Sequence, residues 1–332
     1  MTSGSGSSTP NVMYSWRVQA LETWMRKQAE KAGATTVTME TMLRAGHLDQ
    51  YHYLGLDAND DVITLLQLDK TKKILDIGCG IGGPGRYIAW KTGCEVHGID
   101  IQADLVESAN RVAKEVGLDH LTQFQASDCT QSDCLFPLEG EAYDGFYCIL
   151  VFLHIPLAPR LVGFQNTFRQ LKPSATFVIE DYLLKVPSVS ELTEEERHLL
   201  EDVIGAVCVP TVEEYTKHLT EIGFADVEFE DLTDVWTKWT VARRDRFLAK
   251  KSTQVALHGE AHVTKMETFY KAPPQLFESG KLGGYRITGR KPPADASGSL
   301  EAGRKLIAAK KTNELTVAAL ETIMDAQQTI AE

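Results

Sequence analysis

The segment KILDIGCGIGGPGRYIA, residues 73–89, constrains the fold of this chain more than any other. It begins with an apolar run of strand length, contains five glycines, and ends with the composition of a helix. A strand, a glycine-rich turn and a helix in this order create a concave backbone surface at the carboxyl edge of a parallel sheet. Because glycine lacks a side chain and tolerates positive φ, a ligand can approach the main-chain N–H groups there. The segment therefore predicts a ligand-binding α/β domain.

Two ligand classes compete for this glycine loop. Gly78, Gly80 and Gly83 satisfy the G-x-G-x-x-G spacing of dinucleotide-binding turns, which has low specificity by itself. Asp100, at the end of the next expected strand, suits the ribose of either ligand. Asp76 separates the classes, because a carboxylate two residues before the first glycine repels a pyrophosphate and attracts an ammonium group. The sequence thus favours a nucleoside with a cationic amino-acid end over a dinucleotide, and over a turn that binds nothing.

Strand-like and helix-like segments alternate from Lys72 onward, which predicts a doubly wound, mostly parallel α/β sheet covered on both faces. Seven strands are expected, with the last pair antiparallel, at 72–78, 94–101, 122–128, 143–153, 175–184, 226–233 and 283–291. Helices are expected at 11–33, 36–46, 83–91, 103–116, 157–170 and 211–224. Thr211 and Glu214 have the spacing of a capping box at the start of the last of these helices.

The remaining segments divide the chain into parts. Residues 1–10 have the composition of a disordered tail, and residues 11–66 are expected to form a helical cap before the sheet domain at 67–291. Insertions at 182–210 and 234–283 exceed ordinary loop lengths and are interpreted as helical lids. Residues 292–332 are predicted to form a linker and an amphipathic helix. The N- and C-terminal helices offer apolar faces either to the body of the protein or to a second subunit, so a homodimer is one arrangement that the sequence allows.

The charge of the chain excludes several partners. With 34 basic and 46 acidic residues the net charge is −12, so neither nucleic acid nor an anionic membrane is expected to bind. No apolar run is long enough to span a bilayer, and no secretory leader is recognised. The six cysteines include no C-x-x-C pair, which indicates reduced thiols in a cytoplasmic protein. The HGEAH segment at 258–262 lacks the spacing of a zinc site, so no metal is expected.

Several ordered motifs resemble those of class I S-adenosylmethionine-dependent methyltransferases. They are LDIGCGIGG at 75–83, GID at 98–100, ASD at 126–128, YDGFYCILVFLH at 143–154, and LKP at 171–173 followed by FVIEDY at 177–182. The resemblance implies a Rossmann-like fold and S-adenosylmethionine as the methyl donor, with S-adenosylhomocysteine as a product. It implies that Asp76, Gly78, Cys79 and Gly80 hold the methionine end. Asp100 would take the ribose and Asp128 the adenine amine, with Ile101 and Cys129 flanking the ring or merely packing in the core.

Among these enzymes the chain is most similar to those that methylate small molecules, such as phosphoethanolamine, sarcosine, dimethylglycine and sterols. The FLHI segment at 152–155 matches the position where many of them carry a histidine after the fourth strand. The resemblance implies that His154 is catalytic and pairs with an N-terminal tyrosine, either Tyr51 or Tyr53; a structural histidine is the alternative. Leu150 departs from the acid that these relatives usually carry four residues before the histidine, which weakens the case for a simple ammonium acceptor.

The late insertion suggests how an acceptor is held. Trp236, Trp239, Arg243 and Phe247 share one face of an expected helix, and arginine binds carboxylates with two parallel hydrogen bonds. Trp239, Arg243 and Asp181, which ends the fifth strand, are the candidate acceptor-binding residues; an ordinary packed helix is the alternative. We expect methyl transfer to an amine nitrogen, in a metabolite that can carry a carboxylate. Methylation of a thioether sulfur or of a sterol- or quinone-like carbon stays open, as does a non-catalytic scaffold.

Overall fold

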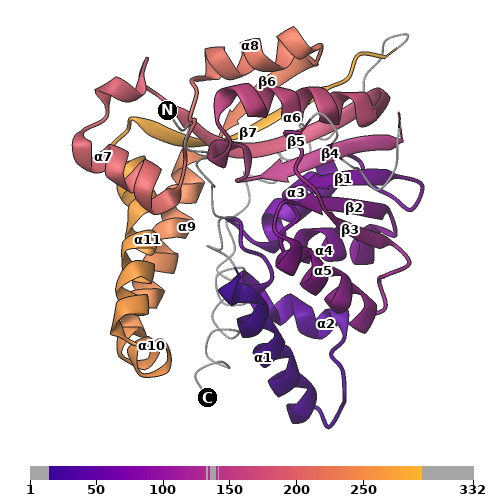
Figure 1. Cartoon of the computed structure of the whole chain (residues 1–332), viewed down its shortest axis with the longest axis vertical. Coiled ribbons are helices and arrows are strands. Elements are labelled where there is room, and N and C mark those ends of the chain that lie inside the picture. The colour runs from indigo at the N-terminus through magenta and orange to yellow at the C-terminus, as the bar shows by residue number, and fades with distance from the viewer. Residues whose placement is uncertain (1–14, 132–133, 135–139, 141, 294–332) are drawn as a thin grey trace, which may run out of the picture.

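The computed structural model describes residues 15–131, 134, 140 and 142–293. Within these residues lies a seven-stranded sheet with the strand order β3-β2-β1-β4-β5-β7-β6 (Figure 1). The strands are β1 (Lys73–Ile77), β2 (Glu95–Asp100), β3 (Thr122–Ala126), β4 (Tyr143–Ile149), β5 (Leu171–Leu184), β6 (Ala225–Asp231) and β7 (Leu282–Arg290). The first five are parallel neighbours, and β7 lies between β5 and β6, antiparallel to both. The predicted Rossmann-like sheet with an antiparallel last pair is confirmed.

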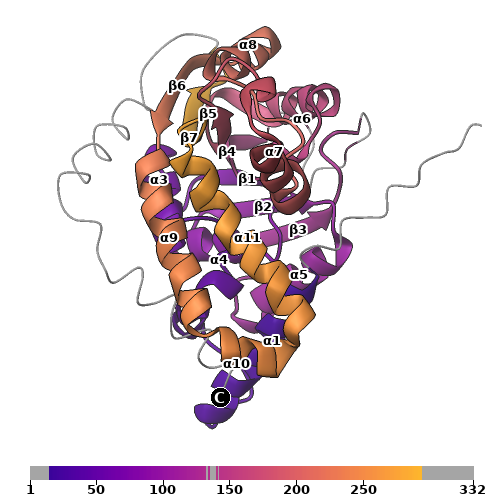
Figure 2. The same ribbon diagram turned by 90° about the vertical axis from the view of Figure 1, so that its left-hand side faces the viewer.

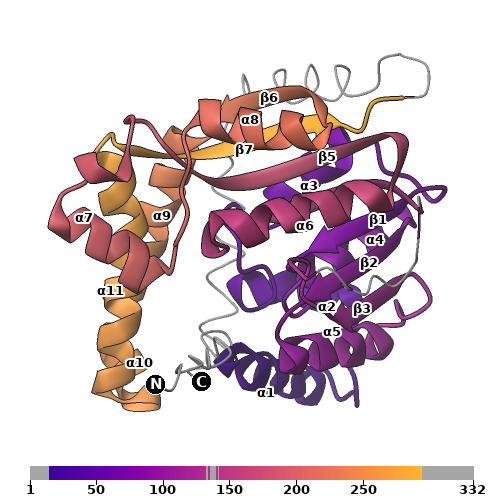
Figure 3. The ribbon, with the colours of Figure 1, turned by 45° about the horizontal axis from the view of Figure 1, so that its top comes forward.

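Helices cover both faces of the sheet, as Figure 3 shows. The helices α3 (Leu56–Leu65), α4 (Gly83–Thr92) and α5 (Ala103–Glu115) lie on one face, and α6 (Leu157–Gln170) and α8 (Val212–Ile222) lie on the other. The predicted capping box starts α8, because the Glu214 amide donates to Thr211 Oγ1 over 3.2 Å and the Thr211 amide donates to Glu214 Oε2 over 2.9 Å. Local sequence signals thus fix where these helices begin.

The N-terminal segment is helical and packs on the side of α4 and α5. It contains α1 (Trp16–Lys31), α2 (Met39–Met42) and the 3-10 helix η2 (Leu43–Leu48). Leu21, Trp24 and Met25 are buried in the same apolar cluster as the inner side of α4. A loop at 49–55 then leads to α3, with positive φ at Leu54 and Gly55. This loop is in backbone contact with the glycine turn, since a Cβ on Gly83 would lie 2.0 Å from the Asp49 carbonyl oxygen.

The two insertions are helical. The first contains η4 (Val189–Glu191), α7 (Glu194–His198) and a π-helical turn, η5 (Leu199–Ile204). The second contains α9 (Thr233–Ala249), α10 (Lys251–His258) and α11 (Glu260–Glu278); α9 and α11 lie side by side with α10 at their far end (Figure 2). The predicted tail at 1–10 and the predicted C-terminal helix at 300–332 lie outside the described residues.

A buried arginine ties four elements together. Arg286 on β7 is 1% exposed and forms ion pairs with Glu180 on β5 at 2.7 Å, Asp61 on α3 at 2.7 Å and Glu230 on β6 at 3.1 Å. Glu180 is itself fully buried, so its charge depends on this one guanidinium for compensation. Arg286 therefore links the helical cap to the antiparallel edge of the sheet.

We expect the substitution Arg286→Met to lower the free energy of unfolding by about 3 kcal/mol, because it leaves the Glu180 carboxylate buried without a counter-charge. Urea denaturation followed by circular dichroism measures this change. The matched control is Lys185→Met, which breaks the more exposed ion pair between Lys185 and Asp231 and should change stability by less than about 1 kcal/mol. Equal effects of the two substitutions would contradict the prediction.

Candidate active site

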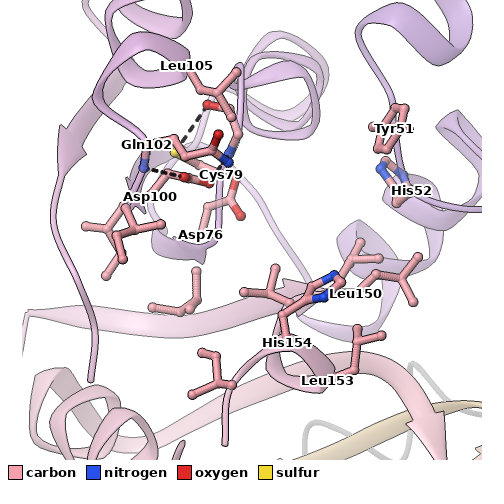
Figure 4. A pocket seen from close by; sticks show the side chains of 18 of the residues that line it. Tyr51, His52, Asp76, Cys79, Asp100, Gln102, Leu105, Leu150, Leu153 and His154 are labelled. Carbon is pink, nitrogen blue, oxygen red and sulfur yellow. Dashed lines mark hydrogen bonds between the residues drawn. The ribbon is translucent and has the colours of Figure 1, made fainter. Parts of the chain in front are cut away.

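One cavity of about 690 Å³ lies at the carboxyl ends of β1, β2 and β4, beneath the helical cap and beside the second insertion. Figure 4 shows its two sides: Asp76, Cys79, Asp100, Gln102 and Leu105 on one, and Tyr51, His52, Leu150, Leu153 and His154 on the other. All the residues that the sequence analysis assigned to cofactor binding or catalysis line this cavity. They are Asp76, Gly78, Cys79, Gly80, Asp100, Ile101, Asp128, Cys129, His154, Tyr51 and Tyr53.

The glycine loop forms the floor of the cavity on the β1 side. Gly78 and Gly80 have φ values of 77° and 53°, which residues with side chains rarely adopt. Gly78 also has no room for a side chain, since a Cβ there would lie 2.3 Å from a Val151 methyl carbon. The Gly78 amide donates to the Ile99 carbonyl over 2.8 Å, which ties the loop to β2. Both positions therefore favour glycine for conformational reasons, and Gly78 does so for steric reasons as well.

Asp76 is a buried acid at the bottom of the cavity. It is 3% exposed, and its Oδ2 accepts a hydrogen bond of 2.7 Å from the Tyr147 hydroxyl. Burial raises the pKa of Asp76 to about 7. Among the described residues no cation forms an ion pair with this carboxylate. Such a site is completed by a positively charged group of a ligand.

Asp100 and Asp128 stand at the ends of β2 and β3. Asp100 accepts two backbone hydrogen bonds of 2.9 Å, from the Gly80 and Gln102 amides, and burial raises its pKa. Burial alone would raise the pKa of Asp128, but hydrogen bonds from Thr130 and Gln131 outweigh burial and lower this pKa. Asp100 thus holds the glycine loop in shape while it lines the cavity, and Asp128 stays ionised.

Ile101 and Cys129 form the wall between these two acids. Ile101 is 69% exposed, which is unusual for a large apolar side chain, and Cys129 is buried. An apolar surface that lies open at the edge of a cavity is suited to contact with a flat ring of a ligand. From the sequence alone, contact of Ile101 and Cys129 with a ligand ring could not be distinguished from ordinary core packing. For Ile101, the exposed fraction of the side chain argues against a core position.

His154 is held in one tautomer. Its Nδ1 lies 2.8 Å from the Gly205 carbonyl oxygen, which can only accept, so Nδ1 carries a proton. Burial lowers the pKa of His154, so the ring stays neutral at physiological pH and Nε2 keeps its lone pair. Leu150, beside it in Figure 4, has a φ of 57°. The cavity therefore contains a neutral hydrogen-bond acceptor at Nε2.

The expected pairing of His154 with an N-terminal tyrosine is not among the described contacts of the histidine. The Tyr53 hydroxyl lies 2.5 Å from the Tyr182 hydroxyl on β5 instead. Tyr51 stacks on His47 with ring centroids 4.4 Å apart, and the Arg17 guanidinium lies 4.1 Å from its ring centre. Both tyrosines border the cavity, but each is engaged with residues other than His154.

The three residues assigned to acceptor binding are placed differently. Arg243 lines the cavity and is 5% exposed. Trp239 is buried against the Tyr53 ring and the Arg243 guanidinium and is not part of the cavity wall. Asp181 is 1% exposed, accepts the Tyr182 amide over 3.0 Å, and is also absent from the wall. Of these residues, only Arg243 can reach a ligand directly in this arrangement.

Several cavity residues were not identified from the sequence: Arg17, His52, Tyr182 and Phe269. Tyr182 had a usable signal, since it lies near the carboxyl end of the fifth strand, next to Asp181. Arg17 and Phe269 had none, because they come from helices whose packing no local pattern specifies. Within the described residues, no group of three or more His, Cys, Asp or Glu side chains is arranged to bind a metal ion, and no helix has the length and apolar character of a membrane span.

Comparisons with known proteins agree with this geometry. Residues 68–236 match the family described as a methyltransferase domain. The chain is 33% identical over 189 residues to phosphoethanolamine N-methyltransferase of Plasmodium falciparum, covering 55% of this chain and 65% of that protein. It is 30% identical over 175 residues to sterol 24-C-methyltransferase of Candida albicans, covering 51% of this chain and 44% of that protein. The match thus spans less than two thirds of the length of each of these two relatives.

A solved structure supports the fold. Phosphoethanolamine N-methyltransferase 2 of Haemonchus contortus, in complex with S-adenosyl-L-methionine, matches with a TM-score of 0.64 and 21% identity, over 76% of this chain and 57% of that one. The family match covers more than half of the chain and includes the glycine loop, both acids at the strand ends and His154. The chain therefore belongs to the methyltransferase domain family, whose methyl donor is S-adenosylmethionine.

Proposed function

We propose that this protein transfers a methyl group from S-adenosylmethionine to the amine nitrogen of a small metabolite. The observation that carries the proposal is the locked tautomer of His154, which leaves Nε2 as a neutral acceptor facing the cavity. An amine attacks through its lone pair, so an ammonium acceptor must lose a proton before the transfer, and a primary or secondary amine can lose another one after it. His154 Nε2 is suited to take that proton or to orient the N–H bond.

The residues around the glycine loop fit the cofactor. Asp76 offers its buried carboxylate to an ammonium group, and the backbone of Gly78 and Gly80 leaves room for the methionine chain. Asp100 is positioned to accept ribose hydroxyls, and Asp128 to accept the exocyclic amine of adenine. When bound, S-adenosylmethionine supplies a methyl group on a positively charged sulfur. Holding the methyl donor and the acceptor in line can lower the barrier by roughly 7–11 kcal/mol.

Matched relatives support more than one acceptor class. Those named phosphoethanolamine N-methyltransferases act on an amine nitrogen, and this favours nitrogen here. Leu150 favours the second candidate, methylation of a thioether sulfur or an apolar carbon, because an apolar side chain lies beside His154 in the cavity. The match to a sterol 24-C-methyltransferase is in keeping with that alternative. A thioether needs no base, so His154 would then only position the acceptor.

A methyl-transfer screen tests the proposal. Purified protein and isotope-labelled S-adenosylmethionine are incubated with amines, amino acids with free and with amidated carboxyl groups, thioethers and sterols, and the products are identified by mass spectrometry. Label on nitrogen supports the proposal. Label on sulfur, which creates a fixed charge, or on carbon, which adds no basicity, would replace it with the second candidate. Cofactor binding without label on any acceptor would favour the non-catalytic scaffold.

The buried acid predicts a pH dependence of cofactor affinity. The pKa of Asp76 is raised from 3.8 to about 7, so the free protein keeps this proton below pH 7 and must release it to bind an ammonium group. We expect affinity to rise roughly eightfold from pH 6 to pH 7.5 and then to level off. Calorimetry in two buffers of different ionisation enthalpy should show proton release at pH 6. The Asp76→Asn variant should bind weakly with a flat profile; wild-type affinity that is constant or falls over this range would contradict the assignment.

A further inference from the structure

Arg243 presents a buried positive charge that the protein does not neutralise. The residue is 5% exposed, and its Nε and Nη2 atoms have no hydrogen-bond partner among the described residues. No described carboxylate forms an ion pair with it, whereas the buried guanidinium groups of Arg86 and Arg286 pair with acids. A buried charge without a partner is costly, and proteins usually keep one only where a ligand supplies the partner.

Aromatic rings surround Arg243 without replacing that partner. Its guanidinium lies 4.8 Å from the Tyr270 ring centre, 4.9 Å from that of Trp239 and 5.1 Å from that of Tyr53. Ring faces attract a cation but cannot accept its N–H bonds in the plane of the guanidinium. The rings thus fix the orientation of the group. The Tyr53 hydroxyl also forms a hydrogen bond with it, and Nε and Nη2 stay available for an anion.

A second arginine adds positive charge on the same side of the cavity. Arg17 on α1 is 4% exposed, lines the cavity, and donates to the Leu48 carbonyl over 2.9 Å. His47 stacks on Tyr51 between the two guanidinium groups; burial, and then the charges of Arg243 and Arg17, lower its pKa well below the usual value. The imidazole is therefore neutral and adds no charge of its own. The charges of Arg243 and Arg17 both act on this side of the cavity, whereas Asp76 supplies a carboxylate on the other side.

We infer that Arg243, supported by the charge of Arg17, binds a carboxylate of the methyl acceptor. The substrate class is then an amine that carries a carboxylate, of the amino-acid or betaine-precursor type, and not a simple cationic amine. This inference rests on the proposed function for the statement that the reacting atom is a nitrogen. The existence of the carboxylate site does not depend on the proposed function. The other source of a carboxylate is the methionine end of the cofactor, and the experiment separates the two.

The first arm measures anion binding without turnover. The complex with S-adenosylhomocysteine, in which the cofactor's own carboxylate is already bound, is titrated with acetate, and tryptophan fluorescence is recorded because Trp239 contacts Arg243. We expect saturable binding that is weakened at least about 30-fold in Arg243→Gln, the size expected for lost hydrogen bonds to a charged group. Arg244→Gln, next in sequence but partly exposed and paired with Asp245, is the matched control and should bind like the wild type. No acetate binding, or equal binding by Arg243→Gln, would overturn the inference.

The second arm assigns the carboxylate to its source. S-adenosylmethionine and methylthioadenosine, which lacks the amino-acid end, are titrated into the wild type and Arg243→Gln. Equal affinities for both ligands in the two proteins support an acceptor carboxylate. A loss confined to S-adenosylmethionine would assign Arg243 to the cofactor and overturn the inference.

The third arm uses the acceptor screen. Among labelled nitrogen acceptors, a free carboxylate should give a kcat/KM at least about 30-fold higher than its amide, and Arg243→Gln should remove that preference. Equal rates for acid and amide in the wild type would overturn the inference while leaving nitrogen methylation intact. If no nitrogen acceptor is labelled, the proposed function fails, and the acetate titration still decides whether the carboxylate site exists.

Discussion

Replacing His154 with asparagine is expected to lower kcat by about 10²- to 10⁴-fold with little change in cofactor affinity, if the acceptor is an amine. The amide nitrogen of asparagine occupies nearly the same place as Nδ1 of histidine. It can keep the hydrogen bond to the Gly205 carbonyl, which His154 makes over 2.8 Å. The substitution thus removes the Nε2 acceptor and preserves the anchor. Steady-state kinetics on the acceptor found in the screen, with calorimetric titration of the cofactor, measure the two effects.

Two further substitutions sharpen this experiment. His154→Gln places its amide near the former Nε2 position without the basicity of imidazole, and His154→Ala removes both contacts. If His154 only anchors the segment around Gly205, the asparagine variant should keep its activity and the alanine variant should lose it. Full activity of His154→Asn would therefore assign the histidine a structural role. Methylation at sulfur would have the same signature, because a thioether gives up no proton.

Removal of the Asp100 carboxylate is expected to weaken cofactor binding by at least about 100-fold. Two hydrogen bonds from ribose hydroxyls to a charged acceptor are lost, each of which contributes about 1.5–3 kcal/mol. The same carboxylate accepts the Gly80 and Gln102 amides, so Asp100→Ala also loosens the glycine loop. Calorimetric titration with S-adenosylhomocysteine measures the affinity directly.

The control for this prediction is Asp104→Ala, which removes an exposed acid four residues further on, in the first turn of α5. It changes the net charge by the same amount and should leave the affinity within about twofold. Thermal unfolding of both variants without ligand shows whether the fold is kept. Unchanged affinity in Asp100→Ala would show that the ribose is bound elsewhere in the cavity.

The half of the cavity around the glycine loop was predictable because its contacts are local. Gly78, Gly80 and Asp100 are placed by two adjacent strands and the turns that follow them, and parallel pairing of these strands brings their carboxyl ends together. The motif spacing alone therefore specified which side chains meet. The same holds for the capping box of α8, where both partners lie within one helical turn.

The half of the cavity around Tyr53 and Arg243 was predicted less well because its contacts join distant segments. The Tyr53 hydroxyl meets that of Tyr182, 129 residues further along the chain, and no periodicity encodes that pairing. The sequence did place Trp236, Trp239, Arg243 and Phe247 on one helix face, and all four are buried. It could not show that Arg243 reaches the cavity and that Trp239 does not, since this depends on how α9 packs against the loop at 49–55.

The strand order also has a consequence for how the chain is made. Among the strands of the described residues, β6 pairs only with β7, and β7 comes last in the sequence, inserted between β5 and β6. During synthesis from the N-terminus, β6 has no neighbour to join and Glu180 has no counter-charge until residues 282–290 have left the ribosome. The parallel strands from β1 to β5 can assemble earlier, but the sheet closes only after translation has passed Arg286. A nascent chain at that stage exposes an unpaired strand edge, the kind of surface that molecular chaperones protect.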